Sequence, residues 1–436
     1  MKVAVVGAGI TGLALTHYLA EEGIESVTFE ASDEPGGVIQ SRQVDGHTLE
    51  VGPQRMRKTP GVAELAAAGG VEDAFVEANE EHLFVYTGGK LREVPFSKRE
   101  FFRTDLLSWP GKVRLLAEPL TRSGQPTETA EELFVRKFGR EAYERFIGPL
   151  YGGIYGSDPA EMPAAYALEG LLEREQKHGN FLQAFRERVG QGQRSPPVTL
   201  EGGNQQLANA VADSYSNRIE LETPVTNIDP LAESSDRTVA VATDGSGDGA
   251  HGYRVETPSG SHEVDHVIVT TPAAVTGDLL SDIADGTGGL RELRYNQLAL
   301  VFLESDCDRE GFGYQVGYDE DLRTLGVSWN DGMFDRENLY TAFLGGMHDP
   351  EILEADDETL GAIASDEFET VMGSSASVVD VAQLDVGFPA WDQTWWNLED
   401  VETPAGITLA TNYTARMGIP SRVREAREIA TELAES

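Results

Sequence analysis

The first thirty residues constrain the fold of this chain more than any other segment. Residues 2–6 (KVAVV) form an apolar run that predicts a buried parallel strand, and this run leads directly into a glycine-rich turn at 7–12. An amphipathic helix is expected over 13–22, and a second strand over 26–30. Together they predict a βαβ unit of about 30 residues, which requires a parallel sheet with a helix on its face.

The turn contains the sequence Gly7-Ala8-Gly9-Ile10-Thr11-Gly12. In a dinucleotide-binding turn the first glycine permits the tight bend, the second lets a pyrophosphate approach the backbone, and the third allows close helix–strand packing. The free N–H groups at the start of the helix then face the phosphates. Glu30 ends the second strand about 20 residues later, where a carboxylate binds ribose hydroxyls and disfavours the 2′-phosphate of NADP.

A second glycine pair decides between the two common dinucleotides. Ala31 follows the ribose carboxylate, and Gly36-Gly37 comes shortly after it. A nicotinamide dehydrogenase has no need of this pair, whereas a flavin lies extended across the domain and benefits from a second close backbone approach. We therefore expect non-covalent FAD. Cys307 is the single cysteine and lies far from the C-terminus, which excludes a C-terminal cysteinyl flavin, while a histidyl linkage stays open.

The charge of the chain is extreme. Asp and Glu number 74 against 34 Lys and Arg, a net charge of −40, and only seven of the basic residues are lysines. Such an excess destabilises a compact state in dilute salt, and molar salt removes the repulsion by shortening the Debye length to ~3 Å. The composition is typical of a halophile that accumulates salt. It excludes nucleic acid as a partner, because phosphate binding needs a basic face.

Length and hydropathy predict a two-domain cytoplasmic protein. The chain has 436 residues, of which 40% are hydrophobic, enough for a substantial core. We find no window of about 18 apolar residues that predicts a membrane span, and the N-terminal apolar run is too short for a signal peptide. A single cysteine fits a reducing compartment.

The predicted secondary structure changes twice along the chain. Residues 60–200 are expected to be largely helical, with a helical pattern over 128–146, and a tail helix is expected over 421–433. Short strands are expected at 218–221, 237–242, 253–257, 262–270, 294–303 and 339–345, with a flexible loop at 244–252. We predict an α/β fold in which a Rossmann-like FAD-binding domain carries an inserted α+β substrate domain. The expected boundaries are 1–80, 198–292 and 402–436 for the first domain and 81–197 and 293–401 for the second.

Several blocks resemble one known family. The N-terminal blocks VAVVGAGITGLALTHYL, FEASDEPGG and DGHTLEVGP are similar to the flavin amine oxidase superfamily. Residues 134–141 (FVRKFGRE) and 149–156 (PLYGGIYG) resemble its protoporphyrinogen oxidase branch, and the resemblance extends over nearly the whole chain. The chain therefore looks like a protoporphyrinogen oxidase-like flavoprotein from a halophile.

The resemblance implies further cofactor contacts. It places segments against FAD at the end of the 47–53 block, before the strands of the second half, and near the C-terminus. The residues implied are Gly52, Pro53, Val225, Thr271, Asn412, Gly418, Ile419 and Pro420. The last three begin the tail helix, whose positive end would face the flavin ring.

The resemblance also implies an activity. This activity is the oxidation of a porphyrinogen, either protoporphyrinogen or coproporphyrinogen, to the porphyrin by hydride transfer to flavin. O2 or another acceptor then reoxidises the cofactor. No catalytic side chain and no metal site are identified. Departures from the family pattern at Glu34, Thr411, Ser421 and around Trp391 keep two alternatives open. These are another FAD-dependent amine oxidase or polyene desaturase-like enzyme, and a non-catalytic flavoprotein.

A tetrapyrrole site should be roomy and apolar, with a few cations for propionates. Candidate residues are Arg55 and Arg57 in a basic cluster, Tyr151 in a glycine-rich loop, and Trp391 in an aromatic segment. The apolar stretch 101–120 is expected to form a buried helix pair. Membrane contact is therefore expected to be peripheral at most.

The large negative charge predicts that stability rises with salt. Because 40 surplus negative charges must be screened, the melting temperature should increase between dilute and molar KCl. Thermal unfolding followed by circular dichroism at both salt concentrations measures this, and a flat melting temperature contradicts the halophile interpretation.

Overall fold

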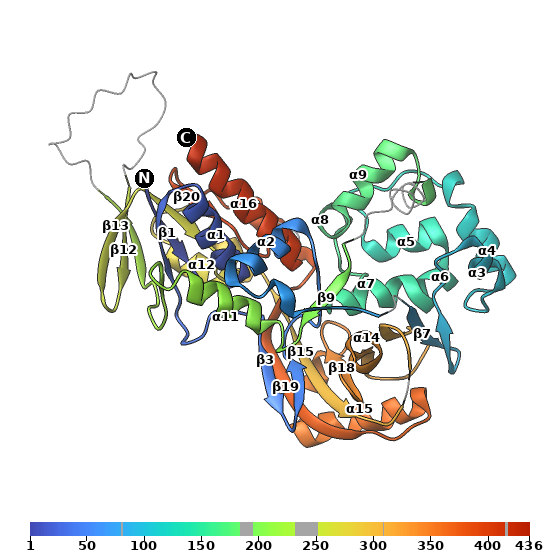
Figure 1. Ribbon diagram of the computed structural model, residues 1–436. Helices are drawn as coiled ribbons and strands as arrows, with labels where there is room; N and C mark the ends of the chain where they lie inside the picture. Colours follow the sequence, from blue (N-terminus) through green and yellow to red (C-terminus); the bar gives the residue numbers. More distant parts are fainter. Residues whose placement is uncertain (80–81, 184–194, 232–251, 308, 415–416) are drawn as a thin grey trace.

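The protein is described from a computed structural model, which places residues 1–79, 82–183, 195–231, 252–307, 309–414 and 417–436. Within these ranges the chain forms a parallel sheet, a larger mixed sheet and a group of helices (Figure 1). The helical group lies beside the mixed sheet and away from the outer strands of the parallel sheet.

The parallel sheet has the strand order β10-β2-β1-β14-β20. Each pair in it is parallel, with Val3 opposite Ser26 on one side and His266 on the other. The strands come from three distant parts of the chain: β1 (Lys2–Val6), β2 (Glu25–Phe29), β10 (Ile219–Glu220), β14 (His266–Val269) and β20 (Ile407–Leu409). An α/β fold is thereby confirmed, while the exact domain boundaries stay a prediction.

Both faces of β1 are buried, as its uniform apolar sequence predicts. Val3 and Val5 face a cluster with α1 (Ile10–Glu21), α2 (Pro60–Gly69), α11 (Gln205–Ser214) and α16 (Ile419–Glu435). Ala4 and Val6 face the opposite cluster, which includes residues of α12 (Ala273–Leu279). A three-stranded antiparallel sheet covers this second face, formed by β11 (Asn227–Pro230), β12 (Tyr253–Thr257) and β13 (Gly260–Val264).

The mixed sheet has the order β19-β15-β18-β17-β16-β7-β8. Helix α15 (Asp357–Met372) packs on one face through Leu360, Ala364 and Phe368. The strands are β7 (Leu83–Thr87), β8 (Lys90–Glu93), β15 (Tyr295–Glu304), β16 (Gly313–Val316), β17 (Thr324–Trp329), β18 (Leu339–Gly345) and β19 (Ser377–Pro389). Three shorter helices accompany them: α14 (Asn330–Phe334), η4 (Pro350–Glu354) and η5 (Gln393–Leu398).

The helical group packs around a buried ion triad. Lys137 is 1% exposed and lies between the carboxylates of Glu118 and Glu175, which are equally buried. Since a buried ammonium is costly without partners, this triad ties three helices to one arrangement. The group comprises α3 (Lys98–Arg103), α4 (Trp109–Leu116), η2 (Glu118–Leu120), α5 (Ala130–Phe138), α6 (Arg140–Ala142), η3 (Tyr143–Ile147), α7 (Gly148–Tyr155), α8 (Ala164–Ala167) and α9 (Glu169–His178).

Small elements join these parts. Strands β3 and β4 form a hairpin, and β5, β9 and β6 form a three-stranded sheet. Helix α13 packs against α12. Their bounds are β3 (Ser41–Val44), β4 (His47–Glu50), β5 (Met56–Arg57), η1 (Glu72–Ala74), β6 (Phe75–Glu77), β9 (Pro197–Leu200) and α13 (Thr287–Glu292).

Most of the predicted strands and the tail helix are confirmed, within a few residues. The strand at 237–242 and most of the loop at 244–252 lie outside the described residues. The expectation of a largely helical 60–200 is wrong in part, because β6, β7, β8 and β9 lie inside it. The helical pattern over 128–146 is interrupted at Gly139, whose φ of +93° ends α5.

The glycine-rich loop expected around Tyr151 is wrong, because these residues form helix α7. Its glycines permit close packing instead of a turn. A Cβ on Gly148 would lie 2.7 Å from the Tyr318 ring, and one on Gly152 would lie 2.2 Å from the Tyr318 hydroxyl. One on Gly153 would lie 2.0 Å from the side-chain oxygen of Gln315.

The expected buried helix pair at 101–120 is also wrong in part. Leu106 and Leu107 are buried, but Trp109 is 66% exposed and Val113 is 65% exposed. Helix α4 turns these side chains outward because Gly111 and Lys112 occupy its buried face.

Candidate functional site

The turn between β1 and α1 is built from backbone. Gly7 has a φ of +104°, and a Cβ on Gly12 would lie 1.9 Å from the carbonyl oxygen of Gly7. Neither position accepts a side chain. Gly9 is different, because a Cβ there would meet nothing within 4 Å. The open space beside Gly9 is what a closely approaching phosphate requires.

The first turn of α1 offers free donors. Gly9 is its N-cap residue, and no side chain caps the helix. The N–H groups of Ile10, Thr11 and Gly12, in that first turn, are the ones that an α-helix leaves without backbone partners. Together with the positive end of the helix dipole they form an anion site.

Glu30 follows β2 and lies beside this turn. Its Oε2 accepts from the backbone N–H of Ala8 (2.6 Å), and its Oε1 accepts from the backbone N–H (3.0 Å) and hydroxyl (2.7 Å) of Ser32. These bonds hold the carboxylate at the carboxyl edge of the sheet, next to exposed Ala31. The N–H of Thr223 donates to the Glu30 carbonyl (2.7 Å), which brings the loop of Val225 to the same edge.

The second glycine pair lies directly against the first motif. The N–H of Gly36 donates to the carbonyl of Ala8 (2.9 Å), and Gly9 and Gly36 form an isolated bridge. A Cβ on Gly37 would lie 3.5 Å from the Cα of Gly9. The two glycine segments therefore stack backbone on backbone.

Gly52 adds a third layer to this stack. A Cβ on it would lie 1.8 Å from the carbonyl oxygen of Val38, and the N–H of Val51 donates to Gln40 (2.9 Å). The carbonyl of Pro53 accepts from the side-chain amide of Asn204 (2.7 Å). Gly52 must be glycine because its backbone touches the segment that follows Gly37.

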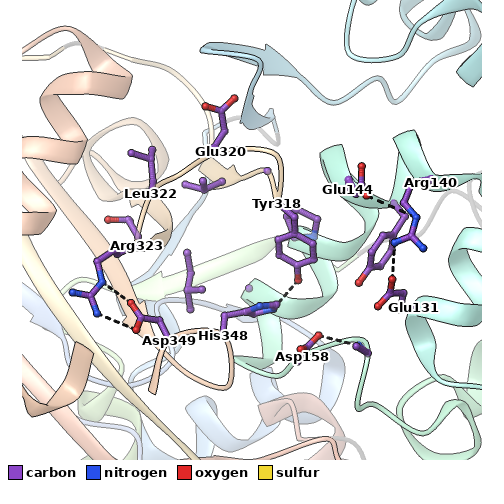
Figure 2. Close-up of a pocket in the computed structure, with 18 residues that line it drawn as sticks. Glu131, Arg140, Glu144, Asp158, Tyr318, Glu320, Leu322, Arg323, His348 and Asp349 are labelled. Atoms are coloured by element: carbon purple, nitrogen blue, oxygen red, sulfur yellow. Dashed lines mark hydrogen bonds and ion pairs between the residues drawn. The ribbon is translucent and has the colours of Figure 1, made fainter. Parts of the chain in front are cut away.

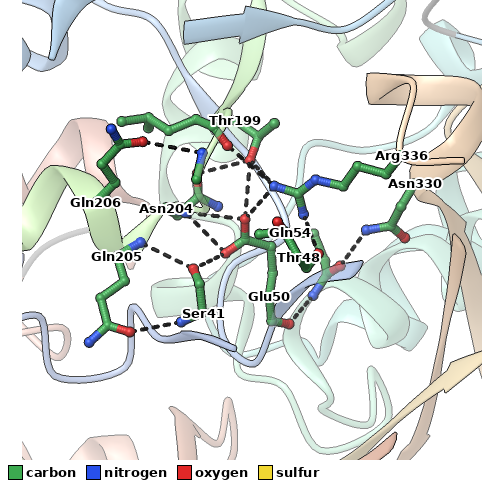
Figure 3. A network of polar contacts seen from close by, with 12 residues as sticks. Ser41, Thr48, Glu50, Gln54, Thr199, Asn204, Gln205, Gln206, Asn330 and Arg336 are labelled. Atoms are coloured by element: carbon green, nitrogen blue, oxygen red, sulfur yellow. Dashed lines mark hydrogen bonds and ion pairs between the residues drawn. The ribbon is translucent and has the colours of Figure 1, made fainter. Parts of the chain in front are cut away.

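A buried polar network supports this third layer (Figure 3). The Glu50 side chain is 1% exposed, and its carboxylate accepts from Ser41 Oγ (2.7 Å), the N–H of Asn204 (3.1 Å) and Arg336 Nη2 (2.7 Å). The 47–53 block was expected near the cofactor, but Arg336, from the loop between α14 and β18 and 286 residues after Glu50, was not.

The strand ends β14 and β20 bring two further candidates together. The Tyr413 hydroxyl contacts the carbonyl of Thr271 (3.4 Å) and bonds to Thr276 (2.7 Å). Burial raises the pKa of Tyr413 to about 12, so its proton stays in place. The neighbouring Asn412 Oδ1 accepts from the hydroxyl of Tyr295, the first residue of β15. Tyr295 is a candidate that no sequence motif indicated, and it is found only through its contacts with Ala273 and Asn412.

Helix α16 starts at the same sheet edge as α1. Gly418 is its N-cap residue, and Ile419 and Pro420 form its first turn, again without a capping side chain. Arg422 is 3% exposed and donates to the carbonyl of Thr411. Burial lowers the pKa of its guanidinium, whose partner is Glu425. Two helix N-termini thus meet where parallel sheets bind their ligands.

Two of the four substrate candidates lie in one aromatic cluster. The Tyr151 ring packs on Phe134 (4.7 Å), and the Trp391 ring stacks on Trp395 at 4.0 Å. Both tryptophans are buried, as core packing predicts. Trp391 also meets the edge of Tyr155. Among the described residues, no acceptor bonds the buried indole N–H of Trp391.

Arg55 and Arg57 have other surroundings. The Arg55 guanidinium lies over the Phe312 ring (4.5 Å), and Arg57 donates to the carbonyl of Ser195 (3.1 Å). Arg55 also donates to the sulfur of Met333 (3.7 Å). Their role as propionate partners stays a prediction.

A pocket of about 530 Å³ is lined by Pro149 and Gly153 of α7 and by side chains that include Tyr318, Arg323 and His348 (Figure 2). Its cations are already paired: Arg140 with Glu131 (2.7 Å), and Arg323 with Asp349 (2.6 Å). His348 bonds to the Tyr318 hydroxyl, and burial lowers its pKa, which keeps the ring neutral. The pocket therefore lacks free cations of the kind that propionates need.

Metal and membrane signatures were sought over the same ranges. In the described part of the chain, no group of three or more His, Cys, Asp and Glu side chains could hold a metal ion. No helix among those residues is both long and apolar enough to cross a bilayer.

The family profile "Flavin containing amine oxidoreductase" matches residues 10–434. Among curated relatives, the chain is 26% identical to protoporphyrinogen oxidase 1 of Spinacia oleracea, over 99% of this chain and 84% of the relative. It is 32% identical to coproporphyrinogen III oxidase of Staphylococcus aureus, over 43% of each chain.

Solved structures show the same fold. A "Putative protoporphyrinogen oxidase" from Exiguobacterium sp. 255-15 superposes with a TM-score of 0.77 at 22% identity, covering 100% of this chain and 98% of that one. A putrescine oxidase variant gives 0.72 at 16% identity, covering 100% and 99%. At such identities the likeness concerns the fold alone.

The geometry at Gly9 predicts the effect of one substitution. The backbone of Gly9 is extended, with a φ of −65°, so Gly9→Leu should fold normally while its side chain fills the phosphate space. We expect loss of FAD binding, measured by flavin absorbance after gel filtration. The matched control is Gly288→Leu, since Gly288 is exposed and also has open space around it. Full FAD occupancy in Gly9→Leu contradicts the cofactor site.

Proposed function

This chain belongs to the family of flavin-containing amine oxidoreductases, and we propose that it oxidises a porphyrinogen to the corresponding porphyrin. It is an FAD-dependent oxidoreductase, and the substrate is the proposed part. The observation that carries the proposal is the match to protoporphyrinogen oxidases along almost the entire chain, at 24–26% identity. The putrescine oxidases share only the fold.

Bound FAD supplies the chemistry, because it accepts two electrons as a hydride from a carbon of the substrate. The residues of the chain bind and orient it. The proposed contacts are the first turn of α1 for the pyrophosphate and Glu30 for the ribose hydroxyls. The uncapped N-terminus of α16 lies at the same edge and favours negative charge there.

The aromatic cluster around Trp391 supports the substrate assignment. Trp391 follows β19 closely, and β19 ends where Pro389 pairs with Tyr295. Tyr295 bonds to Asn412 and accepts from the N–H of Ala273, both at the carboxyl edge of the parallel sheet. A buried indole N–H normally has an acceptor. We propose that the unpaired indole N–H of Trp391 donates a hydrogen bond to a bound tetrapyrrole or to the cofactor.

The proposed activity can be tested without oxygen. Protoporphyrinogen or coproporphyrinogen should bleach the flavin absorbance, and a fluorescent porphyrin should appear. Trp391→Phe keeps an apolar ring but removes the donor, so we expect kcat/KM to fall about tenfold, the equivalent of one hydrogen bond. Arg57→Ala should raise KM more than it lowers kcat, because a propionate contact contributes uniform binding.

Other substrates provide the opposing outcome. An amine or a polyene should leave the flavin oxidised. If an amine bleaches the flavin while both porphyrinogens fail, the porphyrinogen proposal is wrong and the family assignment stands. If no reductant of these classes reacts, the non-catalytic alternative is favoured.

A second proposal concerns where the protein works. Helices α3, α4 and η2, with the residues just before α3, expose apolar side chains that we call the α3–α4 patch: Phe96, Phe102, Trp109, Val113, Leu116 and Leu120. Leu120 is 89% exposed. Helix α3 carries Lys98, Arg99 and Arg103 against one acid, Glu100, in a chain whose net charge is −40. We propose that this patch rests on an anionic lipid surface.

Vesicle flotation tests the patch. The protein should float with phosphatidylglycerol vesicles. Replacement of Trp109, Val113 and Leu120 by Ser should abolish flotation, because each serine removes exposed apolar area that the lipid would bury. The matched control replaces Val378 and Val386, which are also exposed but lie on β19. Equal flotation of both variants overturns the membrane proposal.

A further inference from the structure

The segment Glu50–Gln54 is tied at two points to α14 and the loop that joins α14 to β18 of the mixed sheet. We infer that Arg336 and Asn330 are positioning residues, which set the place of this segment against the FAD site and so couple the substrate sheet to the cofactor. Neither side chain was expected from the sequence, and neither has an assigned role. The inference rests on the proposed function only through FAD, whose binding is measured without any porphyrinogen.

The first tie is a buried ion pair. Arg336 is 10% exposed and Glu50 1% exposed, and the Arg336 Nη2 to Glu50 Oε1 distance is 2.7 Å. The same guanidinium donates to the carbonyl of Thr48 (3.1 Å) and to Thr199 Oγ1 (3.0 Å). The two terminal nitrogens of a planar guanidinium reach these acceptors from fixed, separate positions, whereas an ammonium offers all of its donors from one nitrogen. Figure 3 shows the guanidinium reaching the Glu50 carboxylate from the Asn330 side of the network.

The second tie runs through amide side chains. The Thr341 hydroxyl of β18 donates to Asn330 Oδ1 (3.1 Å), and Asn330 Nδ2 donates to Gln54 Oε1 (3.1 Å). Gln54 Nε2 in turn donates to the carbonyl oxygens of Glu50 (2.7 Å) and Gly52 (3.3 Å). A continuous path of hydrogen bonds therefore joins a central strand of the mixed sheet to the backbone around Gly52.

The backbone around Arg336 is held in an unusual conformation. Asp335 and Asn338 have φ values of +53° and +60°, the left-handed region that few non-glycine residues adopt. Asp335 is fixed by the side chain of Asn79 (2.8 Å). Asp335 is the left-handed residue that ends α14, and Asn338 immediately precedes β18. Aspartate and asparagine adopt this conformation more readily than other non-glycine residues, so these two turns set the path of the loop that carries Arg336 to the Glu50 network.

A shift of the tied segment must reach the cofactor turn. Gly52 contacts the backbone of Val38, and Gly36 bonds to Ala8 within the dinucleotide motif. These contacts are between backbones, so no flexible side chain absorbs a displacement. Movement of the mixed sheet on substrate binding would therefore change the geometry at Gly9 and Glu30.

The test compares FAD affinity with stability. Arg336→Met and Arg336→Lys are measured for melting temperature, for the FAD dissociation constant by flavin fluorescence, and for the visible flavin spectrum. We expect the FAD dissociation constant to rise about tenfold or more in Arg336→Met, and less in Arg336→Lys. Glu50→Gln combined with Arg336→Met removes both charges and should recover stability while FAD affinity stays weak.

The matched control is Lys137→Met. It also removes a buried cation paired with glutamates, but it lies among the helices and not in the Glu50 network. Its melting temperature should fall while its FAD dissociation constant stays at the wild-type value. If the Arg336 variants lose stability but keep wild-type FAD affinity and spectrum, the pair is only structural and the inference is overturned. If Arg336→Met does not fold, Arg336→Lys, which keeps the charge beside Glu50, provides the comparison of FAD affinity with stability.

Discussion

The structure depends on close contact between backbones at the carboxyl edge of the parallel sheet. At Gly7, Gly12 and Gly36 the neighbouring atoms lie so close that no side chain fits. Such contact leaves the N–H groups at the start of α1 uncovered and creates space at Gly9. An apolar core would hold these segments together equally well, but only glycine lets a dinucleotide reach the backbone.

Two kinds of support surround this edge. The inner support is apolar: Val3 and Val5 of β1 pack with α1 and α16, so both helix N-termini stay at one end of the sheet. The outer support is polar, and consists of Glu50, Arg336 and the amides of Gln54 and Asn330. Buried ion pairs contribute little net stability when complete but specify geometry, since breaking one leaves an unpaired charge. The polar bonds therefore fix the orientation of the segments at the cofactor edge, and the apolar packing holds these segments together.

Several expectations failed for a common reason. The sequence around Tyr151 contains glycines that predict a turn, yet α7 uses them to approach Tyr318 and Gln315. The stretch 101–120 contains enough apolar residues for a buried pair, yet Trp109 and Val113 face outward. Glycine content and apolar content describe what a segment can do. The neighbours that pack beside a segment decide what it does: for α7 they are distant in sequence, and for α4 the buried Lys112 donates to the nearby carbonyls of Phe102 and Thr104.

The sequence alone determined the βαβ unit, the dinucleotide turn and the preference for FAD, because these depend on residues within 37 positions of one another. It also determined the net charge of −40. The tertiary structure decided which distant groups meet: Arg336 with Glu50, and Tyr295 with Asn412. Local periodicity carries no information about such pairs, because each joins a loop or strand end to a partner set only by the packing of the two sheets.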